Sequence, residues 1–215
     1  MALPQSAVLA ARRLIDRFDD WRDHAVDRKY GIDTRCAPKP AAAPIALAAG
    51  HGYYYEPIQL AVFRRIMKAL PVEPAALTFI DFGSGKGRAL IFAAEQRFRR
   101  VIGIEYAQDL FAASQSNVAR YRAAANDANP IELHCGDAAR YDLPREDCLC
   151  FFYNPFDETA MTLALARMRH SLRQRPRRLF IAYRNPRHGH LMSNAGFLRC
   201  LTRNSSFDLY EGVTA

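Results

Sequence analysis

The sequence predicts an α/β protein with a doubly wound, mostly parallel seven-stranded sheet that follows an N-terminal helical extension. Two observations predict this class. From residue 77 onward, short apolar runs alternate with helix-length segments, as in strands joined by crossover helices. Most of these runs lack apolar/polar alternation, so both faces of the sheet are expected to be buried, as in parallel sheets.

The 215 residues suit one domain with a short appendage. Residues 1–50 are assigned to the helical extension and a Pro- and Ala-rich linker, and residues 51–215 to the α/β domain. In the extension, apolar residues recur at helical spacing with Arg and Asp between them: Leu14, Phe18, Trp21 and Ala25. Gly31 gives this amphipathic helix a natural end.

Strands and helices of the domain are expected in a regular order. The predicted strands cover residues 77–83, 100–106, 131–137, 148–154 and 178–183. The predicted helices cover residues 57–70, 88–96, 109–125 and 158–172. Residues 196–202 and 206–212 are expected to close the sheet as an antiparallel pair.

The chain is basic, with 30 Lys+Arg against 22 Asp+Glu and a formal charge of +8. Between Glu158 and Asp208 there is no acidic residue, whereas ten arginines occur in the segment 167–203. Such a flank would suit a nucleic acid or a phosphorylated substrate. A solvated helix face in an arginine-rich protein is the alternative interpretation.

Cysteine usage and hydropathy favour a cytoplasmic location. The five cysteines are scattered without a CxxC pair, which favours reduced thiols over a metal site. No apolar run approaches the roughly 20 residues of a membrane helix, so no membrane contact is expected. The first residues lack a basic segment followed by an apolar one, so no signal peptide is expected either.

The most informative segment is a glycine-rich turn between a strand and a helix, at residues 79–88. Gly83 and Gly85 allow a tight turn that brings the backbone close to a ligand, and Gly87 lets the helix begin against the strand. The spacing is GxGxG after an acidic residue, Asp81. It differs from the GxGxxG of dinucleotide sites and from the GxxxxGK[ST] of phosphate loops.

Polar residues also end the next three strands. Glu105 ends the second strand, and a carboxylate there can accept hydrogen bonds from both hydroxyls of a ribose. Asp137 ends the third strand, where it can bind an exocyclic amine, and Asn154 ends the fourth. All of these positions fall at the carboxyl edge of the sheet, where open α/β sheets bind ligands.

In these motifs the sequence resembles the class I S-adenosylmethionine-dependent methyltransferases, over residues 52–211. The resemblance implies a Rossmann-like methyltransferase fold and S-adenosyl-L-methionine as cofactor. It implies that the methionine part binds to Asp81 and the loop of Gly83, Ser84, Gly85 and Gly87, with Tyr55 as a cap. It also implies Glu105 with Tyr106 at the ribose and Asp137 with Ala138 at the adenine.

The segment Asn154-Pro155-Phe156 is similar to the (D/N)PP(Y/F) motif of amino-group methyltransferases, with one proline instead of two. The resemblance implies that the Asn154 amide accepts a hydrogen bond from the target nitrogen and that Phe156 stacks on the acceptor. Asn154 and Phe156 are therefore the candidate catalytic residues, with Asn154 also beside the cofactor. A further resemblance, through the Tyr30–Thr34 and Tyr55–Pro57 segments, is to non-SET lysine methyltransferases.

The predicted activity is transfer of a methyl group to nitrogen in a protein side chain, a nucleic-acid base or a small amine. Two alternatives stay open at this point. A non-catalytic module that binds an adenosyl ligand or nucleic acid would keep the basic flank without needing Asn154. A dinucleotide-dependent oxidoreductase would need the third glycine one residue later. The sequence does not define the acceptor, a general base or the oligomeric state.

Overall fold

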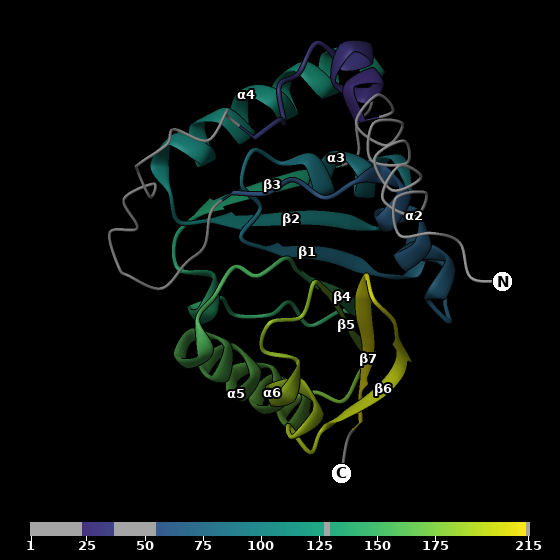
Figure 1. Ribbon diagram of the computed structural model, residues 1–215, viewed down its shortest axis with the longest axis vertical. Coiled ribbons are helices and arrows are strands. Elements are labelled where there is room, and N and C mark those ends of the chain that lie inside the picture. The colour runs from purple at the N-terminus through teal and green to yellow at the C-terminus, as the bar shows by residue number, and fades with distance from the viewer. Residues whose placement is uncertain (1–22, 37–54, 127–129, 214–215) are drawn as a thin grey trace, which may run out of the picture.

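The computed structural model describes residues 23–36, 55–126 and 130–213. At its centre is a seven-stranded sheet in the order β3-β2-β1-β4-β5-β7-β6 (Figure 1). The strands are β1 (Thr78–Phe82), β2 (Arg100–Glu105), β3 (Ile131–Cys135), β4 (Cys148–Phe152), β5 (Leu179–Arg184), β6 (Leu198–Arg203) and β7 (Phe207–Gly212). Strands β1 to β5 are parallel, and β7 runs antiparallel between β5 and β6. The predicted fold class is confirmed.

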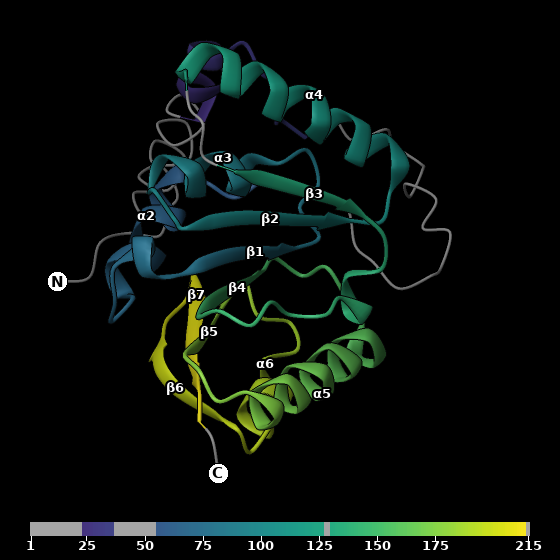
Figure 2. The same cartoon turned by 180° about the vertical axis from the view of Figure 1, so that it is seen from behind.

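Helices cover both faces of the sheet (Figures 1 and 2). One face carries α2 (Leu60–Ala69), α3 (Arg88–Glu95) and α4 (Gln108–Ala125), and the other carries α5 (Glu158–Gln174) and α6 (Gly189–Ser193). The short α6 and the 3-10 turns Pro74–Ala76 and Ala138–Arg140 were not predicted, because such short elements leave no periodic pattern. None of the helices in the described ranges is long and apolar enough to cross a membrane.

Side chains of successive strand residues alternate between two apolar cores. Phe79 packs with the residues of α2, α3 and α4, whereas Ile80 and Phe82 pack with those of α5 and α6. Every residue of β1 and β4 is buried, which explains why these runs lack alternation in the sequence.

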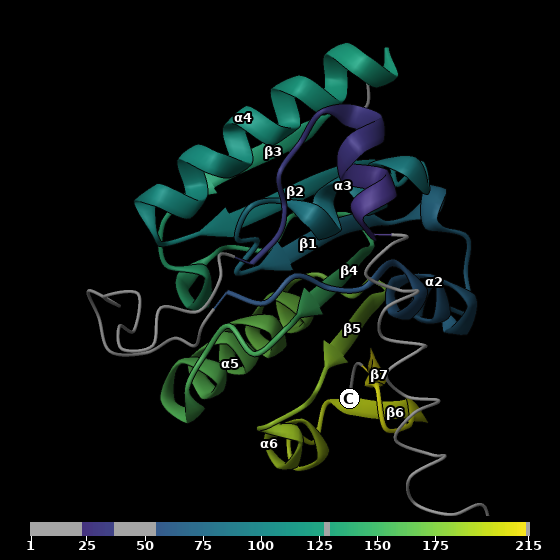
Figure 3. The same ribbon diagram turned by 45° about the horizontal axis from the view of Figure 1, so that its top comes forward.

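Residues 23–30 are helical, and the helix ends at Gly31 with φ +62°, as predicted. Leu14, Phe18 and Trp21 lie outside the described residues. In an amphipathic helix the acidic residues are expected to face solvent. Asp23 and Asp27 are buried instead. Figure 3 shows the chain from 23 to 36 passing beside α3 and α4.

Burial of these two acids has a clear cause in Arg88, the first residue of α3, which is itself only 6% exposed. Its Nη1 lies 3.0 Å from Asp23 Oδ2, and its Nη2 lies 3.6 Å from Asp27 Oδ2. Its Nε donates to Thr34 Oγ1 at 2.6 Å. Asp23 also accepts from the Leu60 backbone N–H at the start of α2. A buried cation thus joins the N-terminal segment to α2 and α3.

The boundary predicted at residue 50 falls outside the described residues.

We expect Arg88→Met to destabilise the protein by about 3–5 kcal/mol, because it leaves two buried carboxylates without their cation. The triple variant Asp23→Asn/Asp27→Asn/Arg88→Met removes all three charges and should recover much of that loss. Urea unfolding measures both, with Lys29→Met as the control, since that ammonium is mostly exposed. Equal stability of Arg88→Met and the wild type would contradict this account.

Candidate active site

Strands β1, β2 and β4 end side by side at the carboxyl edge of the sheet, since Phe82 is paired with Ile104 on one side and Phe152 on the other. The loop after β1 is held to β2, because the backbone N–H groups of Gly83 and Ser84 both donate to the Ile104 carbonyl at 2.9 Å. The three sequence motifs that follow these strands therefore lie together.

Two glycines of the loop make contacts that no side chain would allow. Gly83, Gly85 and Gly87 all have positive φ, at +92°, +54° and +86°. A Cβ on Gly83 would lie 2.7 Å from Pro155 Cβ, and a Cβ on Gly85 would lie 2.2 Å from the Tyr55 ring. The loop is thus in close contact with the Asn154 segment on one side and with Tyr55 on the other.

The Tyr55 ring is fixed over the loop by its hydroxyl, which donates to the Thr34 carbonyl at 2.7 Å. Burial raises the pKa of this phenol, so the hydroxyl stays protonated and available as a donor. Thr34 also binds Asp27 through its backbone N–H and its hydroxyl. The cap over the glycine loop is therefore connected to the Arg88 network.

Glu105 is buried beneath the same loop. Its Oε2 accepts from the Gly85 N–H at 2.7 Å and its Oε1 accepts from the Ala107 N–H at 2.8 Å. Burial raises the pKa of this carboxyl group, and the backbone hydrogen bonds offset part of that rise. A carboxylate has about four lone-pair positions, so Glu105 can accept further hydrogen bonds from a ligand.

Asp81 is 4% exposed near the end of β1, and burial and the Glu105 charge, with no hydrogen bond, determine its pKa within the described ranges. Burial raises its pKa well above the usual range, and the nearby Glu105 charge raises it further. The hydroxyl of Ser84 is likewise buried with no hydrogen-bond partner among the described residues. A buried, unpaired carboxylate is costly to the folded protein, so it is a candidate partner for a cationic ligand.

Asp137 and Ala138 follow β3, beside Glu105. The Asp137 side chain accepts from the Ala139 N–H at 2.9 Å and lies 3.2 Å from Arg140 Nε, so both of its oxygens already have local partners. Ala138 is buried. Tyr106 is the opposite case: its ring is 47% exposed, an unusually high fraction for a large aromatic, directly after Glu105.

Asn154 follows β4 in the left-handed region, at φ +47°, and its side-chain Oδ1 accepts from the Arg187 N–H at 3.4 Å. Asparagine tolerates this conformation better than most residues. Phe156 is buried edge-on against Phe82 and Phe152. The stacking of Phe156 on an acceptor stays a prediction, because the ring would have to turn out of this cluster.

Sequence reasoning missed a polar cluster beside Asn154. The Arg184 guanidinium lies 5.4 Å from the centre of the Tyr153 ring, and the Tyr153 hydroxyl is hydrogen-bonded to Glu56. Burial raises the pKa of Tyr153, and the bond to Glu56 raises it further. Tyr153 lies next to the predicted motif, but only the fold brings Glu56 and Arg184 to it.

No protein-family model matches the sequence, and no curated protein matches it. The fold is similar to several solved structures. One is yhhF, a candidate methyltransferase of Escherichia coli, with 13% identity and a TM-score of 0.53 over 83% of this chain and 92% of that chain. Another is a precorrin-6y C5,15-methyltransferase from Geobacter metallireducens, with 13% identity and a TM-score of 0.51 over 73% of this chain and 89% of that one.

A third similar structure is a predicted N6-adenine-specific DNA methylase from Listeria monocytogenes. It has 14% identity and a TM-score of 0.53, over 74% of this chain and 52% of that one. At these identities the likeness defines the fold. The chain therefore has the Rossmann-like methyltransferase fold, as the motifs predicted, with its glycine loop, acids and Asn154 at the carboxyl edge.

The contact between Gly85 and Tyr55 can be tested against a matched glycine. Gly31 has a similar φ of +62°, but a Cβ there would meet no atom within 4 Å, so Gly31→Ala should cost only the left-handed strain, about 1–2 kcal/mol. Gly85→Ala should cost about 1–3 kcal/mol more, because the Tyr55 ring must move. In a Tyr55→Ala background this extra cost, measured by urea unfolding, should disappear. An unchanged cost in that background would contradict the contact.

Proposed function

We propose that the chain is an S-adenosyl-L-methionine-dependent methyltransferase that transfers a methyl group to a nitrogen acceptor. The observation that carries the proposal is the buried Asp81 carboxylate near the glycine loop, which has no hydrogen bond within the described ranges, in a methyltransferase fold. S-adenosyl-L-methionine has an ammonium group to neutralise such a carboxylate. A nicotinamide dinucleotide offers no comparable amine at its phosphates, so the oxidoreductase alternative is not favoured.

In this proposal the loop of Gly83, Ser84, Gly85 and Gly87 holds the methionine part together with Asp81, under Tyr55. Glu105 accepts from the ribose hydroxyls, with the exposed Tyr106 ring next to it, and Asp137 with Ala138 contacts the adenine. The burial of Asp81 and Glu105 and the free lone pairs of Glu105 fit the group, whereas the exposed Asp137 already has a local partner on each oxygen. When bound, the cofactor supplies a methyl group on a positively charged sulfur, which needs no further activation.

The protein must then align the acceptor with that methyl group and exclude water. Asn154 is in the position to do so, because its loop touches Gly83 through Pro155. Asn154 Oδ1 has two lone pairs, so it can accept a hydrogen bond from the N–H of the methyl acceptor while it still accepts from the Arg187 backbone N–H. The similarity of the fold to a predicted N6-adenine-specific DNA methylase supports a nitrogen acceptor.

The free cysteines in the described part of the chain suit a reducing compartment, so we further propose that the enzyme acts in the cytoplasm.

Titration calorimetry with S-adenosyl-L-methionine, S-adenosylhomocysteine and NADH tests the cofactor. We expect the first two to bind, and Glu105→Ala to weaken both by about 1.5–3 kcal/mol because it removes a charged hydrogen-bond acceptor. A melting curve of the variant controls for the loss of the Gly85 and Ala107 bonds. Binding of NADH alone, or equal affinity in Glu105→Ala, would refute the cofactor assignment.

Asp81 predicts a pH dependence. Its pKa is raised in the free protein by burial and by Glu105, and a bound ammonium would lower it by favouring the ionised form. Cofactor affinity should therefore increase as the pH rises toward the raised pKa of Asp81 and level off above it. Asp81→Asn should bind more weakly at pH 7 and show a flatter profile in calorimetry. An identical slope in the variant would contradict the role of Asp81.

Asn154→Gly keeps the left-handed backbone available while it removes the amide. We expect methyl transfer to a fractionated cell extract to fall sharply, with cofactor affinity almost unchanged, as for a contact made to the reacting group. Asn185→Gly is the matched control, since Asn185 follows β5 with nearly the same φ, +49°. Transfer of label only to oxygen or sulfur, or equal activity of Asn154→Gly, would refute a nitrogen acceptor held by Asn154. No transfer by the wild type would favour a binding module.

A further inference from the structure

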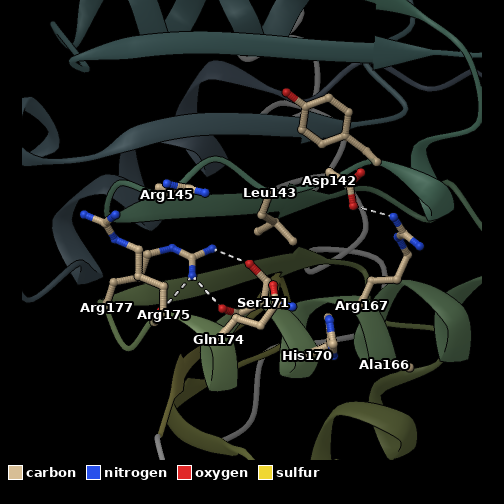
Figure 4. Close-up of a pocket in the computed structure, with 11 residues that line it drawn as sticks. Asp142, Leu143, Arg145, Ala166, Arg167, His170, Ser171, Gln174, Arg175 and Arg177 are labelled. Atoms are coloured by element: carbon tan, nitrogen blue, oxygen red, sulfur yellow. Dashed lines mark hydrogen bonds and ion pairs between the residues drawn. The ribbon is translucent and has the colours of Figure 1, made fainter.

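Five of the ten arginines in the segment 167–203 lie at two places in the fold. Arg184 ends β5 and Arg187 follows it at the carboxyl edge, whereas Arg167, Arg175 and Arg177 line a cavity of about 930 Å³ beside α5. The cavity lies between α5 and the chain at 141–145, which leads into β4 (Figure 4). Arg145, Arg175 and Arg177 gather at one end, and Arg167 lies at the other end beside Asp142.

Arg177 keeps the two walls of this cavity together. Its guanidinium donates to the Ser171 carbonyl and hydroxyl on α5, to the Arg175 carbonyl, and to the Glu146 carbonyl on the opposite wall. The Ser171 carbonyl also accepts from the Arg175 backbone N–H at 3.0 Å, so Arg177 is a second donor to it at the C-terminal end of α5. The cavity is therefore a fixed feature of the fold, and the side chains on its rim project from a rigid frame.

The charges on the walls leave an excess of cations. Each of the three acids nearby has an arginine partner: Asp142 pairs with Arg167, Glu146 with Arg100, and Asp147 with Arg178. Among the described residues, no ion pair or hydrogen bond engages the exposed guanidinium of Arg145 or Arg175. His170, Ser171 and Gln174 add further hydrogen-bonding side chains along the same wall. Such a site selects anionic ligands with several oxygen acceptors.

The cavity is long as well as basic. A second cavity of about 450 Å³ adjoins it and shares Arg145, Arg175 and Arg177 with it. The second cavity also includes Arg99, just before β2, so the groove reaches the amino edge of the sheet. At its other end Tyr141 packs against Phe82, next to the glycine loop. A groove that runs from the carboxyl edge to the amino edge fits a chain of phosphates better than one small anion.

We propose that this α5 groove binds the phosphodiester backbone of a nucleic acid, with Arg145 and Arg175 as its principal phosphate contacts. This inference rests on the proposed function in one respect, that the bound nucleic acid would be the methyl acceptor. Binding of the nucleic acid itself requires no methyl transfer. Phosphate contacts from arginine position a polynucleotide without reading its sequence. The groove then carries the polymer from the reacting edge along the length of α5.

The test measures fluorescence anisotropy of a labelled single-stranded oligonucleotide of mixed sequence, with the full chain, over a range of salt concentrations. Arg145→Glu/Arg175→Glu should reduce the slope of log affinity against log salt by about 1.4, because each phosphate contact to a single strand contributes about 0.7. If the wild type and the double variant bind equally at 1 M salt, this difference in slope makes binding by the variant about 25-fold weaker at 0.1 M salt. The matched control is Arg169→Glu/Arg173→Glu, which makes the same charge change at exposed positions of α5 outside the groove.

Three outcomes would overturn the proposal: no binding by the wild type, an equal loss in both double variants, or displacement of the oligonucleotide by millimolar pyrophosphate, which would indicate a small-anion site. Calorimetry with S-adenosyl-L-methionine on the same proteins separates this result from the proposed function. Cofactor affinity should be the same in both double variants. Absence of cofactor binding in the wild type would refute the methyltransferase proposal and leave the groove to be judged by the anisotropy alone.

Discussion

The buried charge of Arg88 is the constraint on which the arrangement around the glycine loop depends. A guanidinium at the first turn of α3 is unfavourable there unless acids reach it, and the only way to supply them in the described structure is to fold residues 23–34 against α2 and α3. Once Asp27 and Thr34 are held, the Thr34 carbonyl fixes the Tyr55 hydroxyl. The segment before the sheet is thereby positioned over the turn that the sheet presents.

At the carboxyl edge, burial of the carboxylates of Asp81 and Glu105 also costs free energy of folding. Glu105 recovers part of its cost by accepting from the loop and from the start of α4, whereas Asp81 has no such bond among the described residues. A carboxyl group whose pKa is raised in the folded state contributes stability only at low pH and loses it as pH rises through that pKa. An Asp81 kept ionised at neutral pH therefore weakens the free protein, and a cationic ligand would remove the penalty.

Much of this architecture could be predicted from the sequence, because strands buried on both faces and a GxGxG turn after an acid are local patterns. The Arg88 network could not, because Asp23 and Asp27 lie among arginines in a segment whose periodicity suggests that its charges face solvent. The same holds for the cluster of Glu56, Tyr153 and Arg184, whose members are far apart in the chain. Long-range pairing of charges leaves no spacing signal, so only the fold reveals it.

The charges of the molecule are separated in a way that suits two different ligands at once. Acids are concentrated where a cation would bind, under the glycine loop, and the arginines of the α5 groove lie on the other face of the sheet. Arginines around the glycine loop would lower the pKa of Asp81, but they would also pair with its carboxylate in place of a ligand. The site would then lose its preference for a cationic ligand. The intervening sheet would separate a polyanion bound beside α5, as we propose, from the carboxyl groups at the carboxyl edge. Tyr141, which lines the groove and packs on Phe82, is where the two regions meet.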